Sequence, residues 1–192
     1  MSAPKDPAQR RDDDAMTFAM LRFDVGGLAC AFDVQDVVEV VRVVAVTRLP
    51  HVASALAGVV SLRGVVLPIL DLRTTLGEPC GPFDVETRII VVPVRVGPAV
   101  PPVRAAAGPP KPSERLVGFV VDRVHDVDTV PETAANEATS PSSLPARLVR
   151  KILQSPGRIV LVLDPHGIIG AGLGDALEAA WRAQAGGLGH AA

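Results

Sequence analysis

Tyrosine is absent from this chain of 192 residues, and the other aromatic residues are few, with five Phe and one Trp. An excess of charge of one sign is lacking as well, because 19 basic and 21 acidic residues leave a formal net charge of -2. A surface that binds nucleic acid needs positive charge, and one that binds single strands also needs aromatic rings on which bases stack. The composition therefore argues against nucleic acid as a partner.

Cysteine is also scarce. The two residues present, Cys30 and Cys80, stand far apart, and the four histidines are scattered singly. Metal sites built from these residue types need closely spaced ligands, and a disulfide framework needs more cysteines. We therefore expect reduced thiols, no metal and no cofactor.

Long hydrophobic runs are missing too. No stretch of 18 apolar residues occurs, since arginines such as Arg42 and Arg63 interrupt the richest segments. The first fifteen residues are polar and lack the apolar stretch of a signal peptide. The sequence therefore predicts a cytoplasmic protein with a disordered tail over residues 1–15.

What the chain does have is valine and repetition. Hydrophobic residues make up 48% of the sequence, and the abundance of valine favours strands, because β-branched side chains suit an extended backbone. Residues 31–40 resemble residues 118–127, and residues 64–71 resemble residues 157–164. This repeat predicts two similar β units packed together, which offer surfaces and a groove rather than a catalytic cleft.

The apolar pattern and the turn residues predict the elements of the first half. The expected elements are strands over 17–25, 28–34, 36–46, 59–62 and 65–70, and a short helix over 51–57. Gly26 and Gly27 suit the turn of a first hairpin, and Arg63 and Gly64 suit the turn of a second one. Pro68 cannot donate a ladder hydrogen bond, so it predicts a sheet edge or a bulge.

The second half repeats the alternation of strands and turns. The expected strands cover 87–94, 117–121, 124–130, 148–153 and 158–163. Residues 95–113 are rich in proline, and we interpret them as an insertion into a stretch of β structure that runs from 16 to 174.

The C-terminal segment differs in kind from the rest. Residues 175–185 predict a helix with Asp175 as its N-cap and with Leu177, Ala180 and Trp181 on one face. This helix and the residues after it form the last expected segment of the chain, over 175–192.

Two patterns near the C-terminus suggest chemistry, and both have a simpler interpretation. Asp164 and His166 lie close enough for acid-base catalysis, but the proline and glycine around them favour an ordinary turn. The glycines within 170–174 precede a helix, although no strand follows as a dinucleotide fold requires. Asp71 and Asp164 match across the repeat and are more typical of turn caps than of a carboxylate pair. An enzyme using Asp164 and His166 is the less favoured alternative.

The second hairpin carries the most informative charged side chain. Arg63 is either a solvent-exposed turn residue or the charged anchor of a protein-binding face, because a guanidinium can pair with a carboxylate while covering apolar surface. Glu39, in a valine-rich segment, is its natural companion. Both interpretations remain open on these residues alone.

The segment from Gly58 to Arg73 resembles the signature of the CheW-like family of chemotaxis coupling proteins. The matching residues are Gly58, Val59, Leu62, Arg63, Gly64, Pro68, Asp71, Leu72 and Arg73. The resemblance runs from about Phe18 to Leu173, apart from the Pro-rich insertion. It implies a mainly β fold of two SH3-like five-stranded β-barrels, with a short helix and a C-terminal helix.

The resemblance also implies a non-enzymatic cytoplasmic adaptor. Family members bind the regulatory domain of a CheA-type histidine kinase and the cytoplasmic tip of methyl-accepting chemoreceptors, and other CheW-like domains are further candidate partners. By position, Val37, Glu39, Gly58 and Arg63 correspond to receptor-contact residues of the family. No direct membrane insertion is expected.

Two departures from the family pattern leave alternatives open. Ser61 replaces the usual Asn. The hydrogen-bonding side chain beside Arg63 is therefore shorter than in the family pattern. The insertion over 95–113 is longer than expected. A paralogue for a pilus or surface-sensing pathway, and a kinase-binding decoy without receptor binding, are the alternatives to a chemotaxis adaptor.

Overall fold

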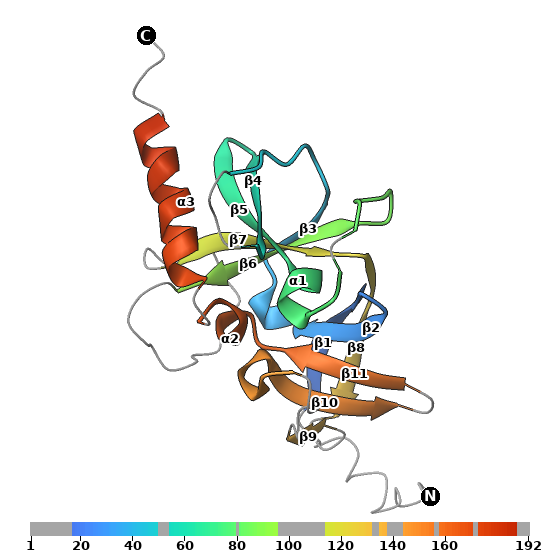
Figure 1. Ribbon diagram of the computed structural model, residues 1–192. Coiled ribbons are helices and arrows are strands. Elements are labelled where there is room, and N and C mark those ends of the chain that lie inside the picture. The colour runs from blue at the N-terminus through green and yellow to red at the C-terminus, as the bar shows by residue number, and fades with distance from the viewer. Residues whose placement is uncertain are drawn as a thin grey trace, which may run out of the picture.

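Two β-sheets dominate the protein, with few helices around them (Figure 1). The computed structural model describes residues 17–49, 54–79, 81–95, 114–131, 135–137, 144–155, 158–170 and 173–187. The expected N-terminal tail lies outside these ranges, and so does the Pro-rich insertion except for Arg95.

The described elements follow the expected alternation of strands and turns. The strands are β1 (Thr17–Val25), β2 (Leu28–Asp33), β3 (Glu39–Arg42), β4 (Leu56–Leu62), β5 (Val65–Asp71), β6 (Arg88–Val94), β7 (Arg115–Val121), β8 (Arg123–Pro131), β9 (Ala135–Glu137), β10 (Val149–Ser155) and β11 (Arg158–Leu163). The helices are α1 (Leu72–Leu76), α2 (Pro165–Ile169) and α3 (Gly174–Gly187), and the 3-10 turns are η1 (Val34–Asp36) and η3 (Ala146–Leu148).

Each sheet takes strands from both halves of the chain. The six-stranded unit has the order β8-β1-β2-β11-β10-β9, and the five-stranded unit has the order β3-β6-β7-β5-β4. The two orders are identical, apart from β9, when each strand of the first half is matched with one of the second. The matched pairs are β1 with β6, β2 with β7, β3 with β8, β4 with β10, and β5 with β11. The predicted duplication is therefore present, but the two units do not coincide with the two halves. The chain crosses from one sheet to the other at η1 and again at Asp122.

The two hairpins that match across the repeat share an irregularity. The β4–β5 ladder shifts register between Leu56 and Gly58, and the β10–β11 ladder shifts between Val149 and Lys151. The extra residue is Ala57 in the first hairpin and Arg150 in the second. These residues stand at the same sequence offset as the matched segments 64–71 and 157–164, so they are structural equivalents.

Matched phenylalanines join the two units at their boundary. The ring centroids of Phe32 in β2 and Phe119 in β7 are 5.5 Å apart, and those of Phe23 and Phe32 are 4.9 Å apart. All three side chains are fully buried. Equivalent residues of the two halves thus touch one another, and one continuous hydrophobic cluster extends into both sheets.

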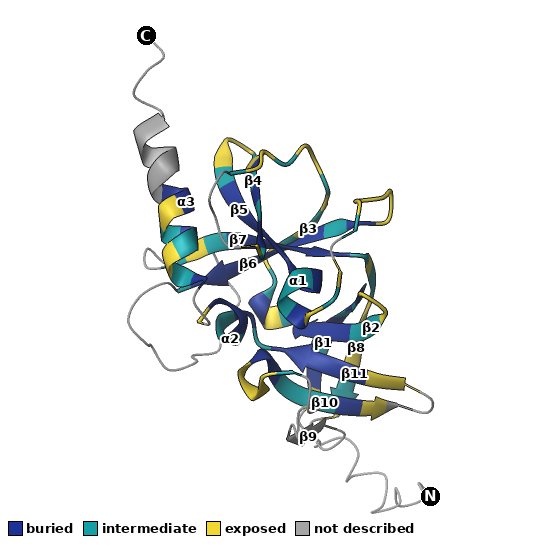
Figure 2. Cartoon of the chain, in the orientation of Figure 1, coloured by how far each residue is buried: buried dark blue, intermediate teal, exposed yellow. Residues whose placement is uncertain are grey.

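Burial follows the position of each strand in its sheet. Figure 2 shows the central strands as mostly buried and the hairpin tips as exposed. In β6, every residue from Ile89 to Val94 is buried. A strand covered on both faces needs an uninterrupted apolar run, which is what the valine-rich sequence supplies there.

The two predicted hairpin turns are confirmed. Gly26 and Gly27 have φ angles of 57° and 82°, and Arg63 and Gly64 have φ angles of 51° and 80°. Two successive left-handed residues make the tight turn whose twist suits a two-residue hairpin. Arg63 adopts this conformation despite having a side chain, and the backbone conformation fixes the direction of its Cα–Cβ bond.

The matched aspartates act as caps, as the sequence suggested. The Asp71 Oδ1 atom accepts a hydrogen bond of 3.0 Å from the Arg73 amide, and Asp164 Oδ1 accepts one of 3.1 Å from the His166 amide. Each cap begins a five-residue helix, α1 or α2, where the sequence predicted only a turn. An N-terminal cap satisfies backbone amides that would otherwise lack partners.

The predicted helix over 51–57 is wrong in its described part. Residues 51–53 lie outside the described residues, Ser54 and Ala55 form a turn, and Leu56 already pairs with Leu70 as the first residue of β4. Alanine favours helices only weakly, and ladder pairing with burial of Leu56 outweighs that preference.

The strand predicted over 36–46 is much shorter than expected. Asp36 belongs to η1, which Asp33 caps by accepting a hydrogen bond from the Gln35 amide. Strand β3 then covers only Glu39–Arg42, and the backbone after it regains a partner at Thr47, which pairs with β4. The β-branched composition favours an extended backbone but does not itself provide a neighbouring strand.

Pro68 does not mark a sheet edge, because β5 lies between β4 and β7. The described ladder between β5 and β7 begins one residue later, at Ile69, so the missing amide hydrogen costs no described ladder bond on that side. The bulge lies in the partner strand β4, at Ala57.

Helix α3 was predicted with nearly the right limits. It begins at Gly174, so Asp175 lies in the first turn and is not the N-cap, although a negative charge is favourable there as well. Leu177, Ala180 and Trp181 are buried as predicted. The guanidinium of Arg115 lies 5.1 Å from the Trp181 ring centroid, which helps to hold the helix against β7.

Candidate protein-binding site

Arg63 and Glu39 form an ion pair, with 2.9 Å between Arg63 Nη2 and Glu39 Oε2. Arg63 stands at the tip of the β4–β5 hairpin, and Glu39 begins β3, so the pair joins the two edge strands of the five-stranded unit. The sequence suggested this companion for Arg63, and the structure brings the two side chains together. Their role in binding a partner stays a prediction.

The same two edges also meet through the backbone. The Thr47 amide donates to the Val59 carbonyl at 2.8 Å, and the Val59 amide donates to the Thr47 carbonyl at 2.9 Å. The segment that follows β3 therefore lies along β4, and the five-stranded sheet closes into a small barrel. Glu39 and Arg63 lie across this closure.

The surroundings of the pair combine charge with exposed apolar surface. The Arg63 side chain is 77% exposed and the Glu39 side chain 22% exposed. Val38 and Val40 flank Glu39 in the chain, Val65 follows the Arg63–Gly64 turn, and all three valines are exposed. Because successive residues of a strand point to opposite faces, Val38 and Val40 lie on the other face of this edge from Glu39. The edge therefore exposes a charge and apolar side chains, both of which a protein partner could contact.

The other two predicted site residues are less accessible. Val37 follows η1, is half-buried and packs against the main hydrophobic cluster. Gly58 is buried, has a φ angle of 144° and lies so close to Thr47 that a Cβ atom would collide with the Thr47 carbonyl oxygen. Gly58 therefore shapes the closure of the barrel and presents no side chain to a partner.

We expect Gly58→Ala to lower the free energy of unfolding by about 1–3 kcal/mol, because it adds both backbone strain and a collision with Thr47. Urea unfolding followed by circular dichroism measures the change. Gly27→Ala is the matched control, since Gly27 has a φ angle of 82° but open space where its Cβ would lie. Equal losses in the two variants would contradict the proposed collision.

Comparison with known proteins identifies the family. The family model described as a CheW-like domain matches residues 19–172. The chain belongs to the CheW-like family. The chemotaxis protein CheW of Bacillus subtilis (strain 168) is 28% identical over 151 residues, which cover 78% of this chain and 85% of that protein. Protein PilI of Pseudomonas aeruginosa is 33% identical over 86 residues, which cover 45% of this chain and 47% of PilI.

A solved structure supports the fold of this CheW-like chain. The crystal structure of the scaffolding protein TtCheW from Thermoanaerobacter tengcongensis matches with a TM-score of 0.67 at 22% sequence identity, covering 82% of this chain and 95% of that one. The expected mainly β fold with two SH3-like barrels is confirmed. Proteins of the CheW-like family are non-enzymatic scaffold adaptors, and this chain is one of them.

The residues considered for catalysis have structural contacts in this CheW-like fold. Asp164 caps α2 and also accepts a hydrogen bond of 3.3 Å from Arg150 Nη2, while the His166 amide donates to Asp164.

Burial, reinforced by the charge of Asp24, raises the pKa of the Cys30 thiol to about 12, so Cys30 is not a thiolate at neutral pH. Cys80 lies outside the described residues.

In the part of the CheW-like chain that the structure describes, no three His, Cys, Asp or Glu side chains are grouped so that they could hold a metal ion. No described helix combines the length and the apolar character needed to cross a membrane.

Sequence reasoning missed a buried charge network at the crossover η1. Arg150 Nη1 lies 3.0 Å from Asp36 Oδ2, and Arg150 Nη2 reaches Asp164 Oδ1. The Asp36 side chain is only 3% exposed. Burial raises the pKa of Asp36, although the positive charge of Arg150 opposes this shift. For Arg150, burial lowers the pKa, but Asp36 and Asp164 outweigh burial, so the net pKa is raised.

An ion pair also holds the other crossover. Arg73 Nε lies 2.6 Å from Asp122 Oδ1, and the Gly26 amide donates to Asp122 Oδ2 at 2.7 Å. Both places where the chain passes between the units are thus fixed by an arginine and an aspartate that are distant in sequence. Asp36 and Asp122 each lie within an apolar segment of the sequence, and this was the available signal for a buried ion pair. The arginine partner of each could not be predicted from the sequence.

Proposed function

We propose that this CheW-like adaptor couples chemoreceptors to a CheA-type histidine kinase in the cytoplasm by binding both proteins. The observation that carries the proposal is the Arg63–Glu39 ion pair, which joins the two edge strands where the five-stranded barrel closes, with exposed valines next to both residues in the chain. A receptor tip would bind there, and Val37 and Gly58 would contribute by shaping the backbone on either side.

The chemistry of the pair suits recognition of a carboxylate. The Arg63 guanidinium has five N–H donors, and its contact with Glu39 uses only part of this fork. Glu39 orients the guanidinium, and the remaining donors are available to an acidic side chain of the partner. When the partner excludes water, such charge-assisted hydrogen bonds become stronger.

Arg63→Glu tests the proposal directly. We expect the variant to lose receptor association by at least about tenfold, because the substitution replaces the donors with a carboxylate that repels both Glu39 and an acidic partner. Kinase binding should be kept, since the variant leaves the other exposed apolar surfaces unchanged. Co-sedimentation with receptor-bearing membranes and pull-down of the kinase regulatory domain measure the two interactions separately.

Two further variants separate binding from folding. An exposed ion pair contributes only about 0.2–1 kcal/mol, so Arg63→Glu should leave the unfolding midpoint almost unchanged. The combination of Glu39→Arg with Arg63→Glu restores an ion pair in reversed orientation and should still fail to bind receptor. Arg123→Glu is the matched control, because Arg123 and Glu86 form an exposed pair elsewhere, with 56% and 50% of their side chains exposed. If the double variant bound receptor as strongly as the wild type does, the assignment of this site would be refuted.

The similarity to protein PilI favours a second candidate function. In this version the adaptor serves a pilus-linked sensory pathway and uses the same Arg63–Glu39 pair toward a different receptor. Deletion of the gene distinguishes the two: loss of swimming chemotaxis supports the first candidate, and loss of surface motility alone supports the second.

A further inference from the structure

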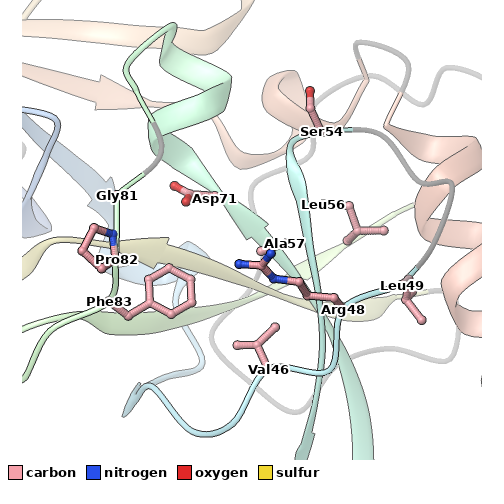
Figure 3. A pocket seen from close by; sticks show the side chains of 10 residues that line it. All are labelled: Val46, Arg48, Leu49, Ser54, Leu56, Ala57, Asp71, Gly81, Pro82 and Phe83. Carbon is pink, nitrogen blue, oxygen red and sulfur yellow. The ribbon is translucent and has the colours of Figure 1, made fainter.

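A pocket of about 390 Å³ opens on the five-stranded barrel (Figure 3). One wall is the segment after β3, with Val46, Arg48 and Leu49, and the opposite wall is the loop after α1, with Pro82 and Phe83. Strand β4 forms the base. The volume is more than large enough for one large side chain of another molecule.

Contacts on both sides hold the walls of this pocket in place. The paired hydrogen bonds between Thr47 and Val59 fix the first wall against β4. On the second wall, the guanidinium of Arg73 lies 6.0 Å from the Phe83 ring centroid, and Asp84 forms a turn in which its carboxylate accepts from the Thr87 amide at 2.9 Å. These contacts hold part of each wall in place without a ligand.

The duplication explains why space is present here. In the six-stranded unit, the bulge residue Arg150 extends to the cap carboxylate Asp164. In the five-stranded unit, the equivalent bulge residue is Ala57 and the equivalent cap is Asp71, and both line the pocket. An alanine in place of an arginine leaves the volume that the longer side chain occupies in the other unit.

The charge at the mouth of the pocket comes from Arg48. Its side chain is exposed, and in Figure 3 it extends across the pocket with the guanidinium towards Phe83 and Asp71. Within the described ranges, Arg48 forms no ion pair. An exposed guanidinium beside an apolar recess complements a carboxylate that stands next to an apolar group.

We infer that this pocket is a docking site for a segment of a partner protein that carries a large apolar side chain next to an aspartate or glutamate. The apolar side chain enters between Leu49, Leu56 and Phe83, and the carboxylate pairs with Arg48 at the rim. This pocket is a different site from the Arg63–Glu39 ion pair, which lies at the exposed tip of the β4–β5 hairpin of the same barrel.

The test uses two blocked tetrapeptides, acetyl-Gly-Phe-Glu-Gly-amide and acetyl-Gly-Phe-Gln-Gly-amide, titrated into the isotopically labelled full chain and followed by NMR. We expect shifts confined to the residues around the pocket, in segments 46–49, 54–57 and 81–83, with about tenfold tighter binding of the acidic peptide. Arg48→Gln should abolish the preference for Glu, whereas Arg42→Gln, at an exposed arginine of β3, should not. Arg63→Glu should leave the titration unchanged, so this test is independent of receptor binding.

A second variant tests the origin of the pocket. Ala57→Arg installs the residue of the other unit, and we expect it to fill the recess and remove binding of both peptides while the unfolding midpoint stays near that of the wild type. Shifts elsewhere on the protein, no shifts up to the solubility limit of the peptides, or equal binding of both peptides to the wild type would overturn the inference. Should Ala57→Arg fail to fold, the comparison of Arg48→Gln with Arg42→Gln decides the question alone.

Discussion

Phe32→Ala is expected to destabilise the whole protein by about 4 kcal/mol, because truncating a fully buried phenylalanine removes apolar contacts and leaves a cavity. The cavity would lie between Phe23 and Phe119, whose rings contact Phe32 from the two sheets. Both units should therefore lose stability together. Urea unfolding, followed by Trp181 fluorescence and by circular dichroism, should show one transition at a lower midpoint.

The matched variant Phe119→Ala and the exposed-site control Val127→Ala complete this test. The two phenylalanine variants should couple in a double-mutant cycle, since the residues touch. Val127 is exposed in β8, so its truncation should change the unfolding free energy by less than about 0.5 kcal/mol. Separate transitions for the two probes in Phe32→Ala would show that the units do not share one core.

Arg150→Met should cost about 3 kcal/mol at neutral pH, because it leaves the buried Asp36 carboxylate without its cationic partner. Methionine keeps much of the apolar stem of arginine, so the loss reports the charge and its hydrogen bonds. Asp36→Asn in the same background should recover part of the loss, since a neutral amide is less costly to bury than a carboxylate. No recovery would mean that the cost arises from packing and not from the buried charge.

The pH dependence of this loss has a definite sign. Burial raises the pKa of Asp36 above its ordinary value of 3.8, so the folded protein keeps that proton to a higher pH than the unfolded chain does. The stability contributed by this residue is complete below pH 3.8 and declines as the pH rises through the folded pKa. Without Arg150 the pKa rises further, and the deficit of Arg150→Met relative to wild type should therefore be smaller at pH 5 than at pH 8. A deficit that does not change with pH would contradict this account.

Local signals in the sequence were sufficient for the turns and caps. Gly26–Gly27 and Arg63–Gly64 were recognised because left-handed residues are demanded by a two-residue hairpin, and Asp71 and Asp164 because a short acidic side chain after a strand suits a cap. These features depend on a few neighbouring residues. They are therefore encoded where they occur.

Features that depend on distant partners were not predictable in the same way. The exchange of strands between the halves left the repeat visible but hid which strands pair, since β2 and β11 are far apart in sequence. Of the four predicted site residues, Glu39 and Arg63 meet at an ion pair, whereas Val37 and Gly58 support the backbone. Arg150 was overlooked because a lone arginine gives no sign of the carboxylates that it will meet.

The exchange of strands at η1 and Asp122 makes the two halves of the chain depend on one another. A single half of this chain would leave its first two strands and its last three without their neighbours, whereas two copies of one half could supply each other and close as a twofold homodimer. The present chain is equivalent to such a dimer joined between α1 and β6. A true homodimer would display an arginine at both hairpin tips, but the sequence between β10 and β11 contains none. One molecule of the present chain therefore carries a single hairpin arginine of this kind, where the homodimer would carry two.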